Sequence, residues 1–513
     1  MPEQSAQHSW LQSLSAFIHP RVISMLFLGF SAGLPILLIF SSLSLWLREA
    51  GIERSAVTYF SWAALGYSFK FVWAPLVDSL QLPLLSNWLG RRRSWLMLAQ
   101  FGIATAIVGM GLSNPSHSLT AMAVAAVMLG FCSATQDIVI DAYRIESAKS
   151  DLQAMMSSTY IAGYRIGMLV AGAGALFLAS WFGSSAEHYS YSAWQSAYFI
   201  MASCMSVGVI TTLCIPEPQL QKAEQSYQDS VRFFTLFLLI VSSFIACFVL
   251  SSDLAGQASA QLKDFSGNRA LASFITESLR LVCAAGAAAV TAYACVSLNL
   301  VKRKVVDQTY IAPVRDFFQR YGTQAALLLL ALVGLYRISD IVLGVISNVF
   351  YQDLGFSKIQ IATVVKTFGL FMTLAGGFLG GLLSMRYGVM RILWLGAILS
   401  AATNLLFMLL ASMGNELWML YAVISADNLS AGIASAAFIA FLSSLTNISF
   451  TAMQYAIFSS LMTLLPKVLG GYSGALVDSV GYPQFFILTA LIGLPVLLLI
   501  QLCGKYLNVA PKS

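Results

Sequence analysis

The stretch Gly377-Gly-Phe-Leu-Gly-Gly-Leu-Leu-Ser-Met-Arg386-Tyr-Gly388-Val-Met-Arg391 closes one apolar segment and opens the next. It combines a helix end made of small residues, a tight turn and basic residues. A related arrangement occurs earlier, where Asp78 follows one apolar segment and Gly90-Arg91-Arg92-Arg93 precedes another. We interpret the recurrence as the trace of two similar halves, because many transporters are built from internal repeats with weak sequence symmetry.

The composition indicates a polytopic membrane protein. Hydrophobic residues make up 58% of the 513 residues and charged residues 10%, whereas soluble chains carry about 25% charged residues. The net charge of +6 resides mostly in short connections between apolar segments, so it does not indicate nucleic-acid binding. The seven cysteines form no CxxC motif and the four histidines are dispersed. We therefore expect no metal site and no cofactor.

Fourteen segments are long and apolar enough to cross a membrane, since a spanning helix needs about 20 such residues. They lie near 22–45, 56–79, 94–112, 118–143, 158–182, 193–215, 231–251, 271–298, 323–350, 359–385, 389–413, 416–445, 450–477 and 483–504. We expect an all-α membrane protein with two six-helix bundles, residues 1–215 and 323–513. Residues 216–322 then form a central linker that contains two additional spans.

The distribution of basic residues predicts the orientation. With the N-terminus inside, seventeen of the 28 lysines and arginines lie in inside segments, five lie in outside loops and six lie within spans. We therefore expect both termini in the cytoplasm. The two central spans are predicted to form a lipid-facing hairpin with a polar outer loop at about 252–270, and partner docking by that loop is the alternative.

The run Ala134-Thr-Gln136-Asp137-Ile-Val-Ile-Asp141-Ala places two carboxyl groups on one helix face, because residues four apart point the same way. Ionisable groups at membrane depth are costly and usually face a bundle interior or a water-filled path. We expect Asp137 or Asp141 to bind a proton and Gln136 to bind a polar solute. In the alternative, Asp141 and Arg144 form a clamp at the helix end that only stabilises the fold.

Other unusual residues of the first half permit two interpretations each. Arg165 either binds solute or pairs with an aspartate in a structural contact. Lys70 either extends to the membrane interface or, with Tyr67, lines a solute path. In the first span, the glycines and proline of Gly29–Pro35, among them Gly33, break the helix to line a cavity, or they form a simple packing kink.

The second half repeats the pattern of charges within spans. Arg337 and Asp340 are three residues apart, so they can pair locally. Lys366, Asp427 and Gln454 follow in later spans. A cavity with both signs of charge suits a zwitterionic or anionic solute, and a structural charge network is the alternative.

Taken together, these motifs resemble the AmpG family of muropeptide permeases within the major facilitator superfamily. The similar segments cover nearly the whole chain: Leu28–Pro35, Phe69–Asp78, Gly90–Trp95, Ser133–Ala142, Gly163–Val170, Tyr336–Asp340, Lys366–Leu370, Asn447 and Phe450–Ala456. The resemblance implies import of N-acetylglucosaminyl-1,6-anhydro-N-acetylmuramyl peptides across the bacterial inner membrane, driven by protons. It also implies a part in peptidoglycan recycling and in β-lactamase induction.

The resemblance assigns functional positions to Gly33, Ala134, Gln136 and Asp137. The chain departs from the family pattern at Arg337, where lysine is common, and at Asp427, where glutamate is common. We expect a monomeric, non-enzymatic transporter whose partners are muropeptide, protons and membrane lipid. The alternatives are a carrier of another bulky anion, such as acetyl-coenzyme A, and a membrane sensor that transports nothing.

The residues and the resemblance together define three sets of candidates. The proton-coupling candidates are Asp137, Asp141, Asp340 and Asp427. The substrate-binding candidates are Gly33, Tyr67, Lys70, Ala134, Gln136, Arg165, Arg337, Lys366 and Gln454. The gating candidates are Asp78, Arg91, Arg92, Arg144 and Arg386.

Overall fold

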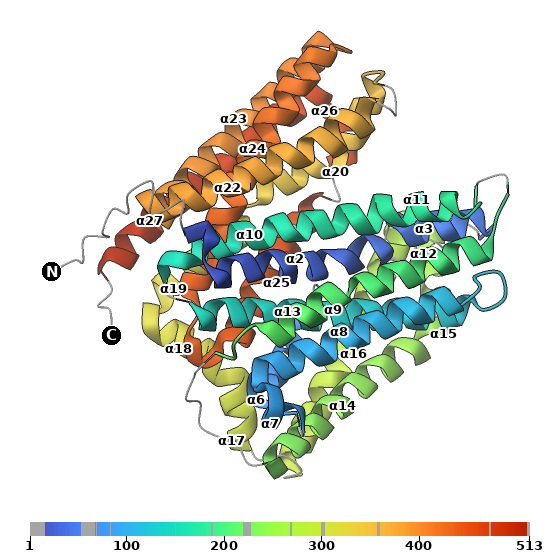
Figure 1. The fold of residues 1–513 in the computed structure, drawn as a ribbon, viewed down its shortest axis with the longest axis vertical. Helices are drawn as coiled ribbons and strands as arrows, with labels where there is room; N and C mark the ends of the chain where they lie inside the picture. The colour runs from blue at the N-terminus through green and yellow to red at the C-terminus, as the bar shows by residue number, and fades with distance from the viewer. Residues whose placement is uncertain are drawn as a thin grey trace. The chain divides into compact units, whose positions relative to one another are not determined.

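The structure is a computed structural model that describes residues 16–39, 41–52, 67, 69–82, 84–148, 150–185, 188–218, 227–266, 269–298, 303–356, 360–470 and 473–509. The described residues form helices and connections without a strand, as Figure 1 shows. This confirms the predicted all-α class. The chain divides into a larger unit of Met1–Val77, Leu82–Leu220 and Phe317–Ser513, and a smaller unit of Asp78–Gln81 and Gln221–Asp316.

The larger unit contains two sets of helices that follow one another in the chain. The first set is η1 (Ala16–Ile18), α2 (Pro20–Ile39), α3 (Ser41–Glu49), η3 (Lys70–Val72), α7 (Leu85–Leu89), α8 (Arg91–Leu112), α9 (Leu119–Ser147), α10 (Ser150–Leu169), η4 (Val170–Gly174), α11 (Ala175–Trp181), α12 (Tyr191–Cys204) and α13 (Ser206–Cys214). The second is α19 (Thr323–Leu335), α20 (Ile338–Asp353), η6 (Ile361–Phe368), α22 (Gly369–Tyr387), α23 (Val389–Met413), α24 (Leu417–Leu445), η7 (Ile448–Phe450), α25 (Thr451–Gly470), α26 (Ser473–Val480) and α27 (Tyr482–Val509). We call these sets the first half and the second half. The short helix α6 (Ala74–Ser79) and α18 (Ala312–Tyr321) each cross a boundary between the units.

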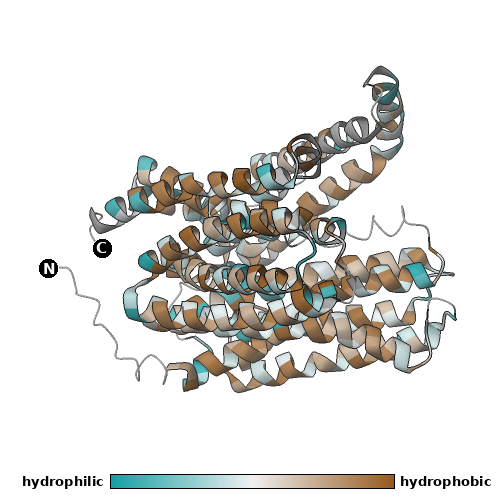
Figure 2. Ribbon diagram, turned by 90° about the horizontal axis from the view of Figure 1, so that it is seen from above, coloured by the Kyte–Doolittle hydropathy of each residue, from teal (hydrophilic) through white to brown (hydrophobic). Residues whose placement is uncertain are grey.

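Ten described helices are long and apolar enough to cross a membrane, or eleven if one bent pair counts as a single span. Large apolar side chains such as Phe101, Val124 and Trp394 are exposed, and Figure 2 shows apolar residues along most of the length of the helices. The chain is therefore a multi-pass membrane protein. The predicted count of fourteen spans is not confirmed. Half of the second predicted span, at 56–79, lies outside the described residues.

The smaller unit holds α14 (Tyr227–Leu250), α15 (Ser252–Ser266), α16 (Arg269–Ser297), α17 (Arg303–Val306) and η5 (Asp307–Ile311). Helices α14 and α16 pack together, and Arg280 on α16 donates to the carbonyl of Phe248 at 2.5 Å. The prediction of a polar loop at 252–270 is wrong, because α15 occupies most of it after a bend of 47°. Good helix formers such as Ala, Gln, Leu and Lys fill this segment, and α15 packs on α16.

Glycines set the closest helix contact of the first half, between α2 and α10. A Cβ atom at Gly33 would lie 2.0 Å from the carbonyl oxygen of Tyr164, and one at Gly163 would lie 1.9 Å from that of Leu26. The two backbones therefore touch directly, as small residues allow in membrane helices. The predicted helix break is wrong, since α2 continues through Pro35. Of the alternative, a packing kink, the packing part fits Gly33.

We expect Gly33→Ala to destabilise the protein by at least the cost of overpacking a well-filled core, about 1–3 kcal/mol. The Tyr164 carbonyl that the new methyl group would strike is backbone and has no rotamer to change. Thermal unfolding in detergent, followed by size-exclusion chromatography, measures the effect. Gly377→Ala is the matched control, because a Cβ at Gly377 meets nothing within 4 Å. Equal losses of thermal stability in Gly33→Ala and Gly377→Ala would contradict the packing argument.

Candidate functional site

At one end of the larger unit, Arg92 ties the first half to the second. Its guanidinium forms a buried ion pair with Glu146 of α9, at 2.5 Å, and donates to the Thr451 hydroxyl at 2.8 Å. Thr451 begins α25, and its hydroxyl also bonds to Glu146. Arg91 adds a longer contact to Glu146, at 3.7 Å. Two predicted gating residues thus belong to one contact between the halves, which we call the Arg92 latch.

Arg144 forms a second contact between the halves at the same end, which we call the Arg144 latch. Its fully buried guanidinium donates to Ser443 of α24 at 2.6 Å, and lies 5.2 Å from the ring centre of Tyr455 on α25. Within the first half it pairs with Asp141 at 3.2 Å. The geometry contains the predicted clamp of Asp141 and Arg144, and extends it to the other half. At this end α10 also packs on α22, and a Cβ at Gly381 would lie 2.6 Å from the Ser158 hydroxyl oxygen.

Beyond the Arg144 latch, a cavity of about 460 Å³ lies between the halves. Aromatic and apolar residues make up much of its wall, and two polar serines come from the second half. Its charged residues are Lys70, Asp137, Asp141, Arg165 and Arg337. Its other lining residues include Tyr160, Tyr164, Ser435, Phe438, Tyr455 and Ser459.

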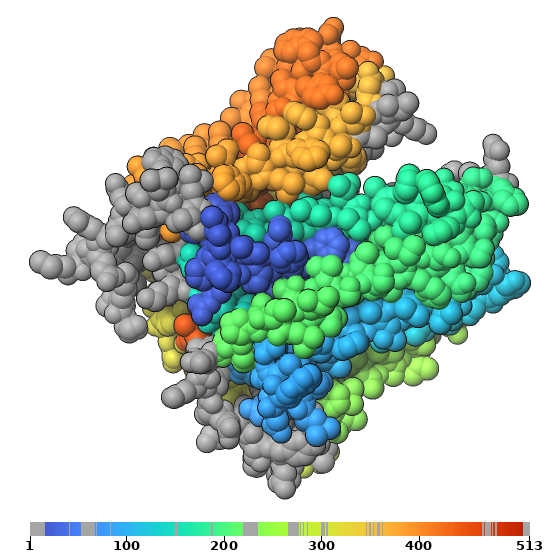
Figure 3. All heavy atoms as spheres, in the orientation of Figure 1, coloured from blue at the N-terminus to red at the C-terminus, as the bar shows by residue number. Residues whose placement is uncertain are grey.

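A second cavity, of about 600 Å³, adjoins the first. Arg165, Met168 and Arg337 line both, so the two cavities are chambers of one path. The other charged residues of the second chamber are Asp340, Lys366 and Asp427. Figure 3 shows the surface indented between the orange and yellow helices of the second half and the green helices α10 and α11. The path is thus closed by latches at one end and indented toward the other.

Four charges of the path have partners of opposite sign within it or beside it. Asp141 lies 3.9 Å from the Lys70 ammonium, besides its contact with Arg144. Arg337 pairs with Asp340 at 3.0 Å, which confirms that these residues can pair along one helix. Each of these pairs combines a cation and an anion in a water-poor wall, where an unpaired charge is expensive.

Arg165 and Asp137 in the first chamber differ from these pairs, because no salt bridge joins either of them to a described residue. Arg165 is exposed within the path, and no salt bridge joins it to Asp137 or Asp141 among the described residues. Asp137 is only 9% exposed, and one of its carboxylate oxygens lacks a hydrogen-bond partner in the described part of the chain. These groups remain available to a solute and to a proton.

Several candidates lie away from the path. Ala134 and Gln136 are fully buried and line neither chamber. Gln136 keeps its amide without a partner among the described residues. Tyr67 packs against the apolar core of the first half. Gln454 accepts hydrogen bonds from Arg320, at 3.1 Å, and from the Asn447 N–H, at 2.7 Å, so it orders the loop before α25.

The remaining gating candidates occupy helix ends. Asp78 is half-buried in α6, and Arg386 is half-buried in the last turn of α22. Sequence reasoning missed Glu146, Thr451 and Ser443, which complete the latches. The signal for Glu146 in the sequence was weak. The one feature that sets it apart from other acidic residues near helix ends is that it follows Arg144 by two residues.

Comparisons with known proteins support the fold and the family. Residues 328–506 match the family described as Major Facilitator Superfamily, and residues 22–117 match the one described as Acetyl-coenzyme A transporter 1. A Rickettsia conorii protein named transporter AmpG 4 is 30% identical over 489 residues, which cover 95% of this chain and 98% of that protein. The anhydromuropeptide permease of Escherichia coli (strain K12) is 29% identical over 499 residues, covering 97% and 82%.

Solved structures agree on the fold. FucP, a major facilitator transporter crystallised in the outward conformation, aligns with a TM-score of 0.60 at 11% identity, covering 95% of this chain and 99% of FucP. The proton:xylose symporter XylE, bound to 6-bromo-6-deoxy-D-glucose, aligns with a TM-score of 0.59 at 12% identity, covering 97% and 96%. At such identities the likeness concerns the arrangement of helices alone.

Proposed function

Because the chain belongs to the AmpG family of transporters, within the major facilitator superfamily, we propose that it imports anhydromuropeptides across the bacterial inner membrane. The cargo is a disaccharide peptide that carries carboxylates, an amino group and sugar hydroxyls. Transport proceeds by alternating access, in which the two halves rock about the path between them. The imported fragments serve peptidoglycan recycling and, through it, β-lactamase induction.

One observation supports the proposal most: the path between the halves carries both signs of charge and, among the described residues, is latched at one end. Arg165 is the cation that binds a cargo carboxylate, since its planar guanidinium suits bidentate contact. Tyr160 and Tyr164 stand beside it, and their rings and hydroxyls suit sugar faces. No covalent step is needed for this task.

The distribution of basic residues supports the direction of transport. The Arg92 and Arg144 latches lie at the end that carries Arg91–Arg93, which belongs to the side rich in lysine and arginine. By the positive-inside rule this end is cytoplasmic. The latched state is then the outward-facing one, ready to take cargo from the periplasm, with both termini in the cytoplasm.

Coupling to protons is assigned to Asp137. Its carboxylate faces the first chamber beside Lys70 and Asp141, so its protonation changes the charge balance of the wall that the cargo meets. When Asp137 is neutral, Asp141 is the one carboxylate that pairs with Lys70. The free-energy cost of closing the path around the cargo is then lower, because one charge fewer is buried. Asp427, which accepts a hydrogen bond from Thr403 at 3.4 Å, is the corresponding candidate of the second half.

The test is uptake of labelled anhydromuropeptide into proteoliposomes that contain the purified protein, with and without an inward proton gradient. Saturable uptake stimulated by the gradient is expected. Labelled acetyl-coenzyme A in the same assay tests the second candidate cargo, which the match of residues 22–117 favours. Uptake of acetyl-coenzyme A with no muropeptide uptake would replace the proposed cargo. No uptake of either solute by folded protein would favour a sensor.

Arg165→Ala is expected to raise the KM for muropeptide about ten- to a hundredfold. A hydrogen bond to a charged partner contributes about 1.5–3 kcal/mol, and 1.4 kcal/mol corresponds to a factor of ten. Arg165→Lys keeps the charge but not the bidentate geometry, so an intermediate KM is expected. Arg48→Ala is the control, because Arg48 is exposed and, within the described part of the chain, its guanidinium bonds to the nearby Ile52 carbonyl. An unchanged KM in Arg165→Ala would exclude Arg165 from cargo binding.

A further inference from the structure

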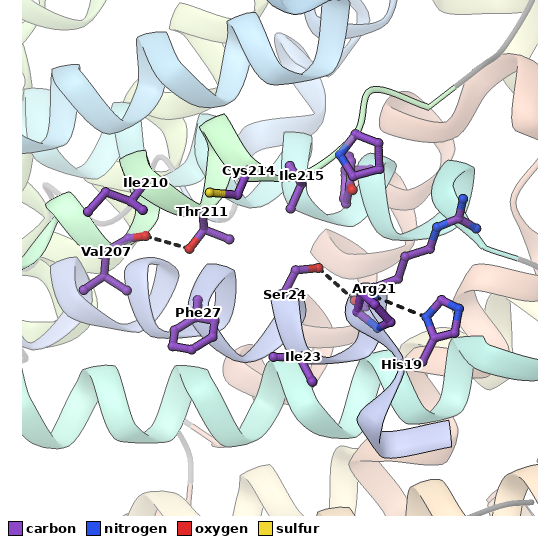
Figure 4. A pocket seen from close by; sticks show the side chains of 13 residues that line it. His19, Arg21, Ile23, Ser24, Phe27, Val207, Ile210, Thr211, Cys214 and Ile215 are labelled. Atoms are coloured by element: carbon purple, nitrogen blue, oxygen red, sulfur yellow. Dashed lines mark hydrogen bonds between the residues drawn. The ribbon is translucent and has the colours of Figure 1, made fainter. Parts of the chain in front are cut away.

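A third cavity lies on the side of the first half and shares no lining residue with the transport path. It encloses about 900 Å³ between the start of α2 and the end of α13, with Tyr143 of α9 contributing to its wall. Figure 4 shows the side chains of the two helices facing each other across it. We call it the α2–α13 groove.

The groove changes from charged to apolar along its length. His19 and Arg21 stand at the start of α2, and two exposed apolar side chains, Ile23 and Phe27, follow on the same helix. On α13 the facing wall holds Val207 and Ile210. A basic end joined to an open apolar channel matches a lipid headgroup joined to an acyl chain.

Three hydrogen-bond donors at the basic end lack partners among the described residues. Tyr143 is fully buried, yet its hydroxyl has no partner in the described part of the chain. The Arg21 guanidinium is exposed and makes no hydrogen bond or ion pair with a described residue. The Nδ1 atom of His19 accepts from the Arg21 N–H at 3.2 Å, so a neutral His19 ring carries its proton on Nε2 and donates there.

One acid beside the groove is already bonded to other groups. Glu217, next to Pro216 at the edge of the groove, accepts from the N–H groups of Arg92 at 2.8 Å and Arg93 at 3.1 Å. Its carboxyl group therefore sits at the start of α8. Burial raises the pKa of Glu217, and the two backbone N–H groups act in the opposite direction. The positive end of the α2 dipole adds to the attraction for an anion.

We propose that the α2–α13 groove binds one anionic phospholipid of the membrane. Arg21, His19 and Tyr143 hold the phosphate, and an acyl chain lies along Ile23, Phe27 and Ile210. In this placement the phosphate lies at the N-terminal end of α2, and the acyl chain lies along the membrane-facing wall of the groove. The assignment depends on the groove alone and is independent of the cargo.

The experiment measures binding of a fluorescent phosphatidylglycerol to the delipidated full-length protein in detergent, with phosphatidylcholine of the same chains as the comparison. Saturable binding of phosphatidylglycerol, at least about tenfold tighter than of phosphatidylcholine, is expected. Arg21→Glu is expected to abolish this preference, and Tyr143→Phe, which keeps the ring, to weaken it. Arg48→Ala, an exposed arginine outside the groove, is the matched control and retains full binding.

Two further measurements distinguish a phospholipid from other occupants of the groove. Val207→Trp fills the apolar wall and is expected to weaken phosphatidylglycerol binding without touching a charge. Glycerol phosphate in excess should not displace the lipid. Equal binding of the two lipids, unchanged binding in Arg21→Glu, or displacement by glycerol phosphate would each overturn the lipid assignment, the last in favour of a soluble anion.

Discussion

Asp137→Asn is expected to abolish gradient-driven accumulation of cargo while leaving exchange of cargo across the membrane intact. Asparagine has nearly the shape of a protonated aspartate, so the wall of the first chamber stays filled, but the residue no longer binds or releases a proton. One unit of pH difference is worth about 1.4 kcal/mol per proton and supports at most about tenfold accumulation with one proton. In Asp137→Asn we expect the ratio of internal to external cargo concentration to fall from this value to one.

The measurement compares two assays in the same proteoliposomes: uptake under an inward pH gradient, and exchange of labelled internal for unlabelled external muropeptide without a gradient. Asp253→Asn serves as the matched control, because Asp253 is exposed at the start of α15 and the substitution is the same. Asp427→Asn reports whether the second half shares the task. Full accumulation by Asp137→Asn would move the proton site away from this residue.

Local spacing explains why several features of the path were predictable from sequence. Arg337 and Asp340 are one helical turn apart, so their pairing requires only that the segment be helical. The same holds for Asp141 and Arg144. Asp137 and Asp141 share a face, and both line the first chamber. Helix periodicity alone brings these residues to one wall.

The limits of sequence reasoning are equally physical. Gln136 precedes Asp137 directly, and adjacent residues of an α-helix are separated by about 100°, so its side chain enters the packed core and not the path. The latches join residues hundreds of positions apart, such as Arg92 and Thr451. Their contact depends on how the halves close, which no local pattern contains. Gly33 illustrates a related point, since close packing and helix breaking favour the same residue type.

Arg144→Ala is expected to open the latched end and to remove most transport. The guanidinium links α9 to Ser443 at 2.6 Å and to the Tyr455 ring, and both partners belong to the second half. A charged hydrogen bond contributes about 1.5–3 kcal/mol and a desolvated cation–π contact about 2 kcal/mol. Their joint loss shifts the balance between latched and unlatched states about a hundredfold or more. A carrier that cannot stay closed on one side no longer captures cargo from the other.

Spin labels test this directly. One label at the exposed Cys214 of α13 and one at Tyr387→Cys, in the last turn of α22, report the separation of the halves at the latched end once the other six cysteines are replaced. A short distance between the two labels is expected in the parent protein, and a longer, broader distribution of distances is expected in Arg144→Ala.

Thr451→Val is expected to change the same distance less. It removes the second-half hydroxyl of the Arg92 latch but keeps the ion pair of Arg92 and Glu146. Arg391→Ala, an exposed arginine at the start of α23, should leave it unchanged. Identical distances in Arg144→Ala and the parent would show that the latch does not set the closed state, and the direction of opening would then have to come from contacts between α10 and α22.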